Sequence, residues 1–478
     1  MAQVERFNNM YDFFGGGDIS KFCQETNYGY LVCGVATDTS NHQVMGLLKI
    51  DKQGNEIEKI TYDLFPNKYY CENGVFNKSD SCIFLIGTIT FPNNDIAAHL
   101  TKLNQYGDTL WTKLIYDTAY NSQGNAIFLR PNGELMIVGA SDKIDVVVNI
   151  LVLKTDSLGN LIWERDFGSF STYDTGWSID STLDGGYVIG CGKYNFGNQV
   201  LKSYVLKIDS FGNYEWGYEY GNINYSNSVS RVSETQNGKI ISAGARGFYK
   251  NINNDVYYKP NITWIDSMGT LLNSKNYSVD SAGFIGFSDI VEIANDEYLI
   301  TGTFEEVQFC KIGLFKTNSN GDSVFARTYQ VFDNYEFAED VNSTSDGGFI
   351  ICGYNYPLNL SQNFRVIKVD SLGCDTLGCQ SVGISENENL WNENNSFLVF
   401  PNPNDGKFFV QVKNIPASAF FETRIEVLDL TGKLIFQTRE NSFRNISEVD
   451  ISTQPAGIYF VRAFFDNAPV GSISIVKQ

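Results

Sequence analysis

The sequence predicts an all-β chain in which a seven-bladed β-propeller precedes a C-terminal Ig-like β-sandwich. An eight-residue turn pattern, represented by LKTDSLGN at residues 153–160, recurs seven times, and successive copies of its glycine lie 53, 52, 53, 57, 52 and 52 residues apart. Each repeat also holds a second hairpin pattern and no helical periodicity, which indicates four short strands, the content of one blade. The recurrent glycines are Gly54, Gly107, Gly159, Gly212, Gly269, Gly321 and Gly373.

The turn pattern places Asp or Asn three residues before the glycine. A short side chain at that position can hydrogen-bond the turn backbone, and the glycine supplies the positive φ. An aromatic residue follows the glycine by eight residues in five copies, as at Tyr62 and Tyr277. The recurrent acids lack the carboxylate density of a calcium loop, so we expect them to cap turns. They are Asp51, Asp156, Asp209, Asp266 and Asp370.

The second hairpin pattern is clearest at residues 184–189 (DGGYVI) and 346–351 (DGGFII). If the strands of a repeat are named a to d from channel to rim, this turn joins a to b and the LKTDSLGN-like turn joins c to d. Both turns then lie on one face of the propeller, which we call the turn face. The b–c and d–a connections lie on the opposite face, which we call the loop face.

The two ends of the repeat region are expected to meet in one blade. Residues 4–11 (VERFNNMY) resemble the strand after the first turn pattern, residues 56–62 (EIEKITY), whereas no such strand follows the last pattern. We therefore expect residues 4–11 to pair with residues 364–370 as the outer strand of the seventh blade, which closes the ring. The propeller is expected to span residues 1–380.

Composition restricts the partners. Lys and Arg number 35 against 55 Asp and Glu, a formal charge of −20, which opposes binding to nucleic acid or anionic lipid. No run of 18 apolar residues is present, so we expect no membrane span. The start of the sequence, MAQV, lacks a basic and apolar leader, which suggests a cytoplasmic protein or a trimmed leader. The C-terminal module described below favours trimming.

Nine cysteines cannot all pair with one another. Cys374 and Cys379 lie close together in a glycine-containing loop and would pair in an oxidising compartment. Cys33 and Cys352 occupy equivalent places in their repeats, where we expect small buried core residues.

The sequence offers little catalytic chemistry. Only two histidines occur, His42 and His99, and we expect both to be exposed polar residues. No glycine-rich nucleotide motif, GxSxG or CxxC pair is present. We therefore predict no catalytic residue, no cofactor and no metal site, although these absences leave an enzyme possible.

The loop face is the expected ligand surface, because its connections vary in length while the opposite turns repeat. The loop at residues 246–258 accounts for the longest repeat spacing. Aromatic rings beside amide and carboxylate groups suit sugars, whereas the bland alternative is that the rings pack between blades. The candidate binding residues are Tyr194, Phe196, Phe248, Tyr249, Tyr257, Tyr354 and Tyr356.

Residues 381–395 (SVGISENENLWNENN) are polar and lack β alternation, so we expect a linker before an all-β module at residues 396–478. The module carries FPNPNDGKF at residues 400–408, VLDLTGK at 427–433 and PAGIYFV at 455–461. Together these closely resemble the type A C-terminal sorting domain of the type IX secretion system of the Bacteroidetes. The positions assigned to sorting are Pro401, Asn402, Pro403, Gly406, Asp429, Gly432, Gly457, Tyr459 and Lys477.

The resemblance implies an export route. A Sec-type leader would take the chain to the periplasm, and the outer-membrane translocon would recognise the C-terminal domain. Removal of that domain would leave the propeller secreted or attached to the cell surface.

Three functions agree with this sequence. The first is a secreted or surface-displayed binding or adhesion protein with a glycan or surface-protein ligand. The second is a polysaccharide hydrolase or lyase, since two carboxylates on neighbouring loops would suffice for glycoside chemistry. The third is a structural component of a surface assembly.

Overall fold

The computed structural model describes residues 5–63, 68–115, 120–143, 147–169, 171–197, 199–221, 226–249, 256–279, 283–294, 296–306, 309–330, 335–356, 362–376, 384–387, 397–412, 422–429, 433–441, 446–465 and 468–478. These ranges contain strands and turns but no helix, so no helix there could cross a membrane. The chain divides into two compact units, Met1–Glu386 and Asn387–Gln478.

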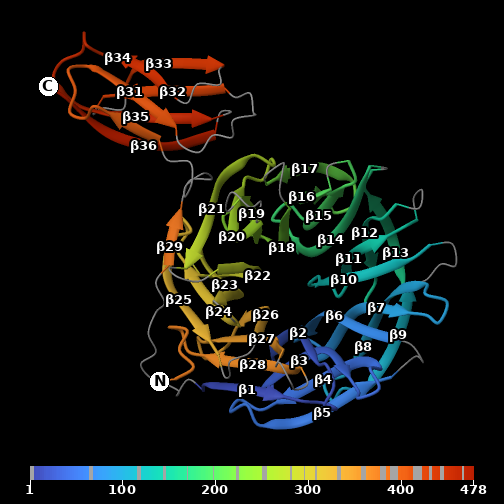
Figure 1. Cartoon of the computed structure of the whole chain (residues 1–478). Helices are drawn as coiled ribbons and strands as arrows, with labels where there is room; N and C mark the ends of the chain where they lie inside the picture. Colours follow the sequence, from blue (N-terminus) through green and yellow to red (C-terminus); the bar gives the residue numbers. More distant parts are fainter. Residues whose placement is uncertain are drawn as a thin grey trace. The chain divides into compact units, whose positions relative to one another are not determined.

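The first unit contains seven antiparallel sheets arranged in a ring as the blades of a β-propeller (Figure 1). Six sheets have four strands and one has five. The strands of the first three blades are β2 (Ile19–Glu25), β3 (Tyr30–Thr37), β4 (Gln43–Ile50), β5 (Glu56–Tyr62); β6 (Lys68–Asn77), β7 (Cys82–Thr90), β8 (Ile96–Leu103), β9 (Thr109–Ile115); and β10 (Ser122–Leu129), β11 (Leu135–Ser141), β12 (Asn149–Thr155), β13 (Leu161–Phe167).

The remaining four blades continue in chain order, and the seventh also takes the first strand of the chain. Their strands are β14 (Thr172–Ser181), β15 (Tyr187–Asn195), β16 (Val200–Ile208), β17 (Tyr214–Tyr220); β18 (Asn227–Glu234), β19 (Ile240–Tyr249), β20 (Val256–Ile265), β21 (Leu271–Val279); β22 (Gly283–Ala294), β23 (Glu297–Glu306), β24 (Phe309–Thr317), β25 (Ser323–Tyr329); and β26 (Tyr335–Ser343), β27 (Phe349–Tyr356), β28 (Asn363–Val369), β1 (Phe7–Tyr11).

Strand β1 closes the ring. It pairs with β28 in antiparallel register from Phe7 opposite Lys368 to Tyr11 opposite Phe364, which is the pairing that the sequence predicts. An ion pair of 2.7 Å between Arg6 and Asp370 extends the contact beyond the strand. The last blade therefore has its outer strand, and its third strand is not left as an open edge.

The recurrent acid caps its turn, as predicted. In the turn after β12, one carboxylate oxygen of Asp156 accepts hydrogen bonds from the backbone N–H groups of Leu158 and Asn160, at 2.9 and 2.8 Å. All seven turn glycines have positive φ, between 70° and 89°. Equivalent bonds at Asp51, Asp209, Asp266 and Asp370 explain why the turn repeats almost unchanged.

Where the aromatic residue eight positions after the turn glycine is a described tyrosine, it ties its blade to the next. The hydroxyl of Tyr277 in blade 5 donates to the carbonyl of Gly321 in blade 6 at 2.8 Å, and Tyr329 donates likewise to Gly373 at 2.7 Å. Tyr11 of β1 donates to Gly54 of blade 1 at 2.6 Å. The N-terminal strand therefore supplies the same interblade bond as the outer strands within the repeats.

Each interface between neighbouring blades has its own buried apolar cluster. The cluster that joins blade 7 to blade 1 includes Phe7, Tyr30 and Cys352, and Cys33 belongs to the next cluster. Both cysteines are fully buried, as expected. Cys374 is disulfide-bonded, and its predicted partner, Cys379, lies outside the described residues.

Part of the predicted linker is a strand. Residues 381–395 were expected to lack β structure, but β29 (Ile384–Asn387) pairs with the outer strand β21 of blade 5 and makes that sheet five-stranded. An outer blade edge offers unpaired N–H and C=O groups, so even a polar segment can pair there. The rest of this stretch lies outside the described residues.

The second unit is a β-sandwich of a three-stranded and a four-stranded antiparallel sheet. Its core contains Phe408, Val427, Val449, Tyr459 and Ile475. The strands are β30 (Phe397–Phe400), β31 (Lys407–Val412), β32 (Glu422–Leu428), β33 (Leu434–Asn441), β34 (Ile446–Asp450), β35 (Gly457–Phe465) and β36 (Ala468–Lys477).

Weakening the packing of the closing strand β1 is expected to destabilise the propeller. Phe7 is 8% exposed and its ring centroid lies 5.9 Å from that of Tyr30, so Phe7→Ala should lower the free energy of unfolding by about 3–5 kcal/mol. Phe211→Ala is the control, because Phe211 is 71% exposed and its loss should cost less than about 0.5 kcal/mol. Urea unfolding followed by tryptophan fluorescence measures both. Equal losses, or an unchanged melting temperature after deletion of residues 1–12, would contradict closure by β1.

Candidate functional site: the propeller channel

The inner strands of the seven blades line one cavity of about 790 Å³. The cavity is also lined by residues near the end of β7, such as Thr88 and Thr90, and by residues at the start of β8 and β16, such as Ile96 and Leu201. These residues lie where b strands end and c strands begin. The cavity therefore lies toward the loop face, the face on which the sequence places the ligand.

Every inner strand carries at least one β-bulge, and in each strand the extra residue of one bulge lines the cavity. In blade 4, for example, the register between β14 and β15 shifts between Gly176 and Ser178, which leaves Trp177 unpaired. Bulges re-aim side chains and are common beside functional sites. The seven bulge residues, which we call the bulge ring, are Lys21, Glu72, Asn125, Trp177, Ser230, Ser288 and Glu339.

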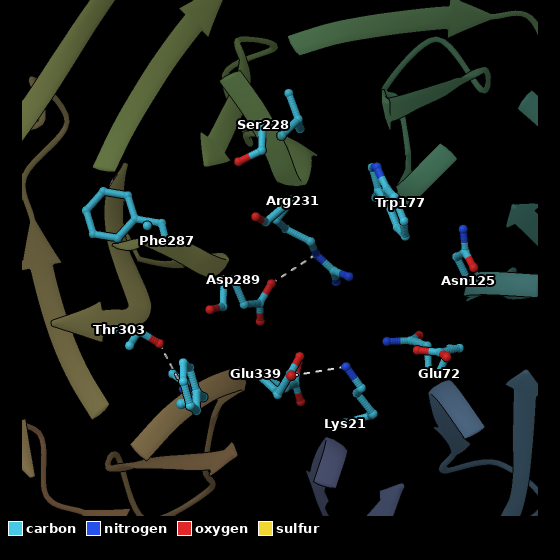
Figure 2. A pocket seen from close by; sticks show the side chains of 18 of the residues that line it. Lys21, Glu72, Asn125, Trp177, Ser228, Arg231, Phe287, Asp289, Thr303 and Glu339 are labelled. Atoms are coloured by element: carbon cyan, nitrogen blue, oxygen red, sulfur yellow. Dashed lines mark hydrogen bonds and ion pairs between the residues drawn. The ribbon is translucent and has the colours of Figure 1, made fainter. Parts of the chain in front are cut away.

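One half of the channel is held by ion pairs, which Figure 2 shows as dashed lines. Lys21 of blade 1 binds Glu339 of blade 7 at 3.0 Å, and Arg231 of blade 5 binds Asp289 of blade 6 at 3.2 Å. Burial alone would lower the pKa of Lys21, but Glu339 and Glu72 outweigh it and raise that pKa. Burial raises the pKa of Glu339.

Two aspartates of the channel also connect neighbouring blades through hydrogen bonds to the backbone. Asp340 accepts a hydrogen bond from the N–H of Cys23 at 2.9 Å, and Asp289 accepts one from the N–H of Val341 at 3.2 Å. Burial, then the nearby charge of Asp289, raises the pKa of Asp340 well above its ordinary value. Burial therefore favours the protonated form of Asp340, and its proton can bind Asp289.

The other half of the channel presents Glu72, Asn125 and Trp177 from three successive blades (Figure 2). Trp177 is 48% exposed, and a Cβ atom on Gly192 would lie 3.2 Å from its Nε1. Because Gly192 has no side chain, the indole of Trp177 can pack closely against β15. The Asn125 amide donates to the carbonyl of Gly176 at 2.9 Å, which fixes its orientation and leaves Oδ1 as an acceptor.

Of the aromatic residues that the sequence selects, Tyr354 lines the cavity, where its ring stacks on Phe337 with centroids 5.1 Å apart. Tyr194 and Phe196 contact each other in blade 4 with centroids 5.9 Å apart. Tyr356 is 51% exposed at the end of β27. These residues belong to the loop face but, apart from Tyr354, not to the cavity lining.

The prediction of a loop at residues 246–258 is wrong for most of the described residues there, which belong to strands β19 and β20. Strands β19 and β20 continue their pairing through Phe248 opposite Tyr257 and Tyr249 opposite Val256. Continued pairing satisfies backbone groups that a loop would leave to solvent. The side chains of Phe248, Tyr249 and Tyr257 lie outside the described residues.

The expectation of two exposed histidines was also wrong for His99. It is fully buried on β8, its Nε2 lies 2.9 Å from the carbonyl oxygen of Tyr70, and burial lowers its pKa to about 4. His99 is therefore a neutral core residue behind the channel wall. Its contacts give it no access to a ligand.

The bulge ring was missed by the sequence analysis, although a regularity points to it. Five of its members lie eight residues before the glycine of an a–b turn, as Trp177 does before Gly185. The other four of these pairs are Lys21 with Gly29, Asn125 with Gly133, Ser230 with Gly238 and Glu339 with Gly347. The amino-acid type at this position differs from repeat to repeat, so the position does not form a recognisable sequence motif.

One cluster of metal-ligand types occurs among the described residues: Cys23, Asp340 and Cys352, all buried. Burial raises the pKa of both thiols, so the thiols are protonated at neutral pH, and it also favours the protonated form of Asp340. The Cys23 sulfur lies 3.8 Å from the carbonyl oxygen of Ile350, and Asp340 also accepts from Asn342 at 3.0 Å. The cluster joins blade 1 to blade 7, and its Asp340 also lines the cavity.

The sorting-motif residues make local structural bonds in the sandwich. The Asn402 amide donates to the carbonyl of Ser474 at 3.1 Å and accepts from the N–H of Val476 at 2.9 Å, both on β36. Asp429 accepts from the N–H of Lys433 at 3.0 Å. Tyr459 donates to the carbonyl of Pro455 at 2.7 Å.

The other sorting positions differ in exposure. Pro401, Pro403 and Gly457 are exposed, whereas Gly406 and Lys477 are buried against each other, since a Cβ atom on Gly406 would lie 2.6 Å from Cε of Lys477. Gly432 lies outside the described residues. A role of these positions in sorting stays a prediction.

The fold and the cavity define a β-propeller with a polar channel open toward its loop face. Residues 398–477 match the family of the secretion system C-terminal sorting domain, so the chain is a cargo protein of the type IX secretion system, exported to the cell surface or beyond. No curated protein shows significant sequence similarity to the chain.

Solved propellers share low sequence identity with the chain. The propeller domain of the Trilobed protease from Pyrococcus furiosus is 9% identical, with a TM-score of 0.39 over 75% of this chain and 95% of that one. A polysaccharide lyase, PL25 ulvan lyase, is 7% identical, with a TM-score of 0.48 over 77% and 98%. The WD40 domain of Toxoplasma gondii coronin is 7% identical, with a TM-score of 0.42 over 79% and 89%.

Substitution of Asp340 and of Asp289 in the channel should have different effects on the free energy of unfolding. Asp340→Asn should be tolerated at pH 7, because burial favours the uncharged form of Asp340, and asparagine can likewise accept from Cys23 and donate to Asp289. Asp289→Asn should lower the free energy of unfolding by roughly 2–3 kcal/mol, because it leaves Arg231 without its partner. Urea unfolding of both variants at pH 7 measures the difference.

The pH dependence provides the second readout. The pKa of Asp340 is higher in the folded chain than in the unfolded chain, where it lies near 4. The protonated carboxyl group therefore contributes its full stabilisation of the fold below about pH 4, and this stabilisation is lost as the pH rises through the pKa of the folded chain. Asp340→Asn cannot ionise, so its stability relative to the original chain should increase with pH. A constant difference between pH 4 and 9 would show that Asp340 is ionised in the fold.

Export is expected to depend on the sandwich unit. Truncation at Asn394 removes the matched sorting domain and should leave a folded propeller in the periplasm, because the propeller has its own cores. Cell fractionation with a periplasmic marker measures its location. Efficient appearance of the truncated chain in the medium would contradict the assignment of routing to residues 396–478.

Proposed function

We propose that the chain is an exported binding protein that holds a carbohydrate in the loop-face mouth of its propeller channel. The observation that carries the proposal is the half-exposed indole of Trp177 inside the cavity, with Asn125 and Glu72 on the next two bulges. An aromatic face stacks on the apolar face of a sugar ring, while amide and carboxylate groups bind its hydroxyls.

The dimensions of the site suit an oligosaccharide. A cavity of about 790 Å³ falls within the usual range for small-molecule sites. Tyr354 and Phe337 form a second aromatic surface across the channel, and Tyr356 is exposed beyond it. A ligand longer than the cavity would meet these rings as it leaves toward the loop face.

Binding fits the carboxyl groups better than hydrolysis does. A glycoside hydrolase needs one carboxyl group free to protonate the leaving oxygen and a second that acts on the sugar. Asp289 and Asp340 accept backbone N–H bonds, and Glu339 is paired with Lys21. Among the described carboxyl groups of the cavity, this leaves that of Glu72 with neither an ion pair nor a backbone N–H bond, which suffices for binding.

Trp177→Ala should abolish most of the affinity for a glycan identified by array screening of the full chain. Loss of a central tryptophan contact typically costs about 2 kcal/mol, which corresponds to a roughly thirtyfold weaker Kd. Tyr214→Ala is the matched control, because this ring is 58% exposed on the outer strand β17. Isothermal titration calorimetry measures both, and the unfolding midpoint checks the fold.

Equal affinity of the two variants would refute the channel site. New reducing ends released from the glycan would assign hydrolysis instead of binding. Failure of every glycan to bind, together with capture of a surface protein that depends on Trp177, would replace the carbohydrate by a protein ligand.

A further inference from the structure

The channel contains a carboxylate, that of Glu72, which no described residue holds in an ion pair. Two cations, Lys21 and Arg231, face the carboxyl groups of Glu72, Asp289, Glu339 and Asp340. Lys21 is bound to Glu339 and Arg231 to Asp289, whereas Glu72 forms no ion pair with any described residue. Glu72 therefore offers a negative charge to whatever enters the channel.

Resting on the proposed carbohydrate function, we propose that Glu72, Asn125 and Trp177 form a subsite for a sugar that carries a positively charged amine. The ammonium group binds the Glu72 carboxylate, a hydroxyl donates to Oδ1 of Asn125, and the sugar ring stacks on Trp177. The ligand class is thus an amino sugar with a free amine, rather than a neutral or acidic sugar.

An amine is favoured over a hydroxyl by the charge of both partners. A hydrogen bond between two ionised groups is about twice as strong as one between neutral groups. The face of an indole also attracts cations. The formal charge of −20 on the whole chain draws cationic ligands toward the channel and repels uronic or sulfated sugars.

The backbone positions of all three residues, and the side chains of Asn125 and Trp177, are held before a ligand arrives. Each projects from a bulge on a different inner strand, β6, β10 or β14, so the spacing between them is set by the packing of blades 2 to 4. Asn125 is fixed by its bond to Gly176, and Trp177 by its place against Gly192. Such an arrangement loses little side-chain entropy when it binds a ligand.

Lys21 is the internal competitor for Glu72, and its geometry explains why it does not neutralise the subsite. Its ammonium group lies 3.0 Å from Glu339, on the opposite side of blade 1 from blade 2, while Glu72 acts on it only through longer-range charge. A ligand amine can therefore bind Glu72 without displacing an existing ion pair.

The test compares glucosamine oligomers with N-acetylglucosamine oligomers of equal length, titrated into the full chain by calorimetry at pH 6. The original chain should bind the glucosamine series more tightly, and added salt should weaken that preference. Glu72→Gln should weaken glucosamine binding by roughly tenfold and leave N-acetylglucosamine binding unchanged. Glu56→Gln, which alters a partly exposed carboxylate on the outer strand β5, should change neither series.

The possible failures are distinguishable. If N-acetylated or other neutral glycans bind as tightly as the amines and depend on Trp177, the amine subsite is overturned while the carbohydrate function stands. If Glu72→Gln binds glucosamine oligomers as well as the original chain does, the role of Glu72 is overturned. If a lysine-rich peptide binds in a Glu72-dependent manner and neither sugar series does, the ligand is a basic protein segment and both proposals fall.

Discussion

Antiparallel pairing between β1 and β28 is the constraint on which the rest of the propeller depends. It joins segments more than 350 residues apart, as in the bond from Arg365 to the carbonyl of Asn9. The seven interblade clusters form a complete circle only when blade 7 has its outer strand and packs against blade 1. Closure therefore fixes the distances between inner strands, and with them the width of the channel.

The same repeat serves two purposes at its two faces. On the turn face, the glycines and the Asp or Asn caps, such as Asp156, are kept from blade to blade, and the interblade tyrosine bond recurs at several interfaces, because each has one geometric task. At the bulges the backbone repeats, but the side chains differ, from Lys21 and Glu72 to Trp177. The repeated backbone thus presents seven side chains whose chemical type can differ from blade to blade.

Local sequence chemistry accounts for what could be predicted. Turn caps, blade number and the role of residues 4–11 follow from short patterns that act within a few residues or repeat in register. The bulge ring could not be predicted in this way, because it depends on how one strand pairs with its neighbour. Phe248, Tyr249 and Tyr257 were assigned to a loop for a related reason, since β19 and β20 continue their pairing through a stretch without clear alternation. His99 resembled an exposed residue, but β8 turns it toward the core.

A crystal structure of the full chain with a bound oligosaccharide would test the central claim most directly. The account predicts a sugar ring stacked on the indole of Trp177 and polar groups of the ligand against Asn125 and Glu72, inside the channel at its loop-face mouth. A sugar bound on the turn face, or on the outer strands away from the bulge ring, would contradict it.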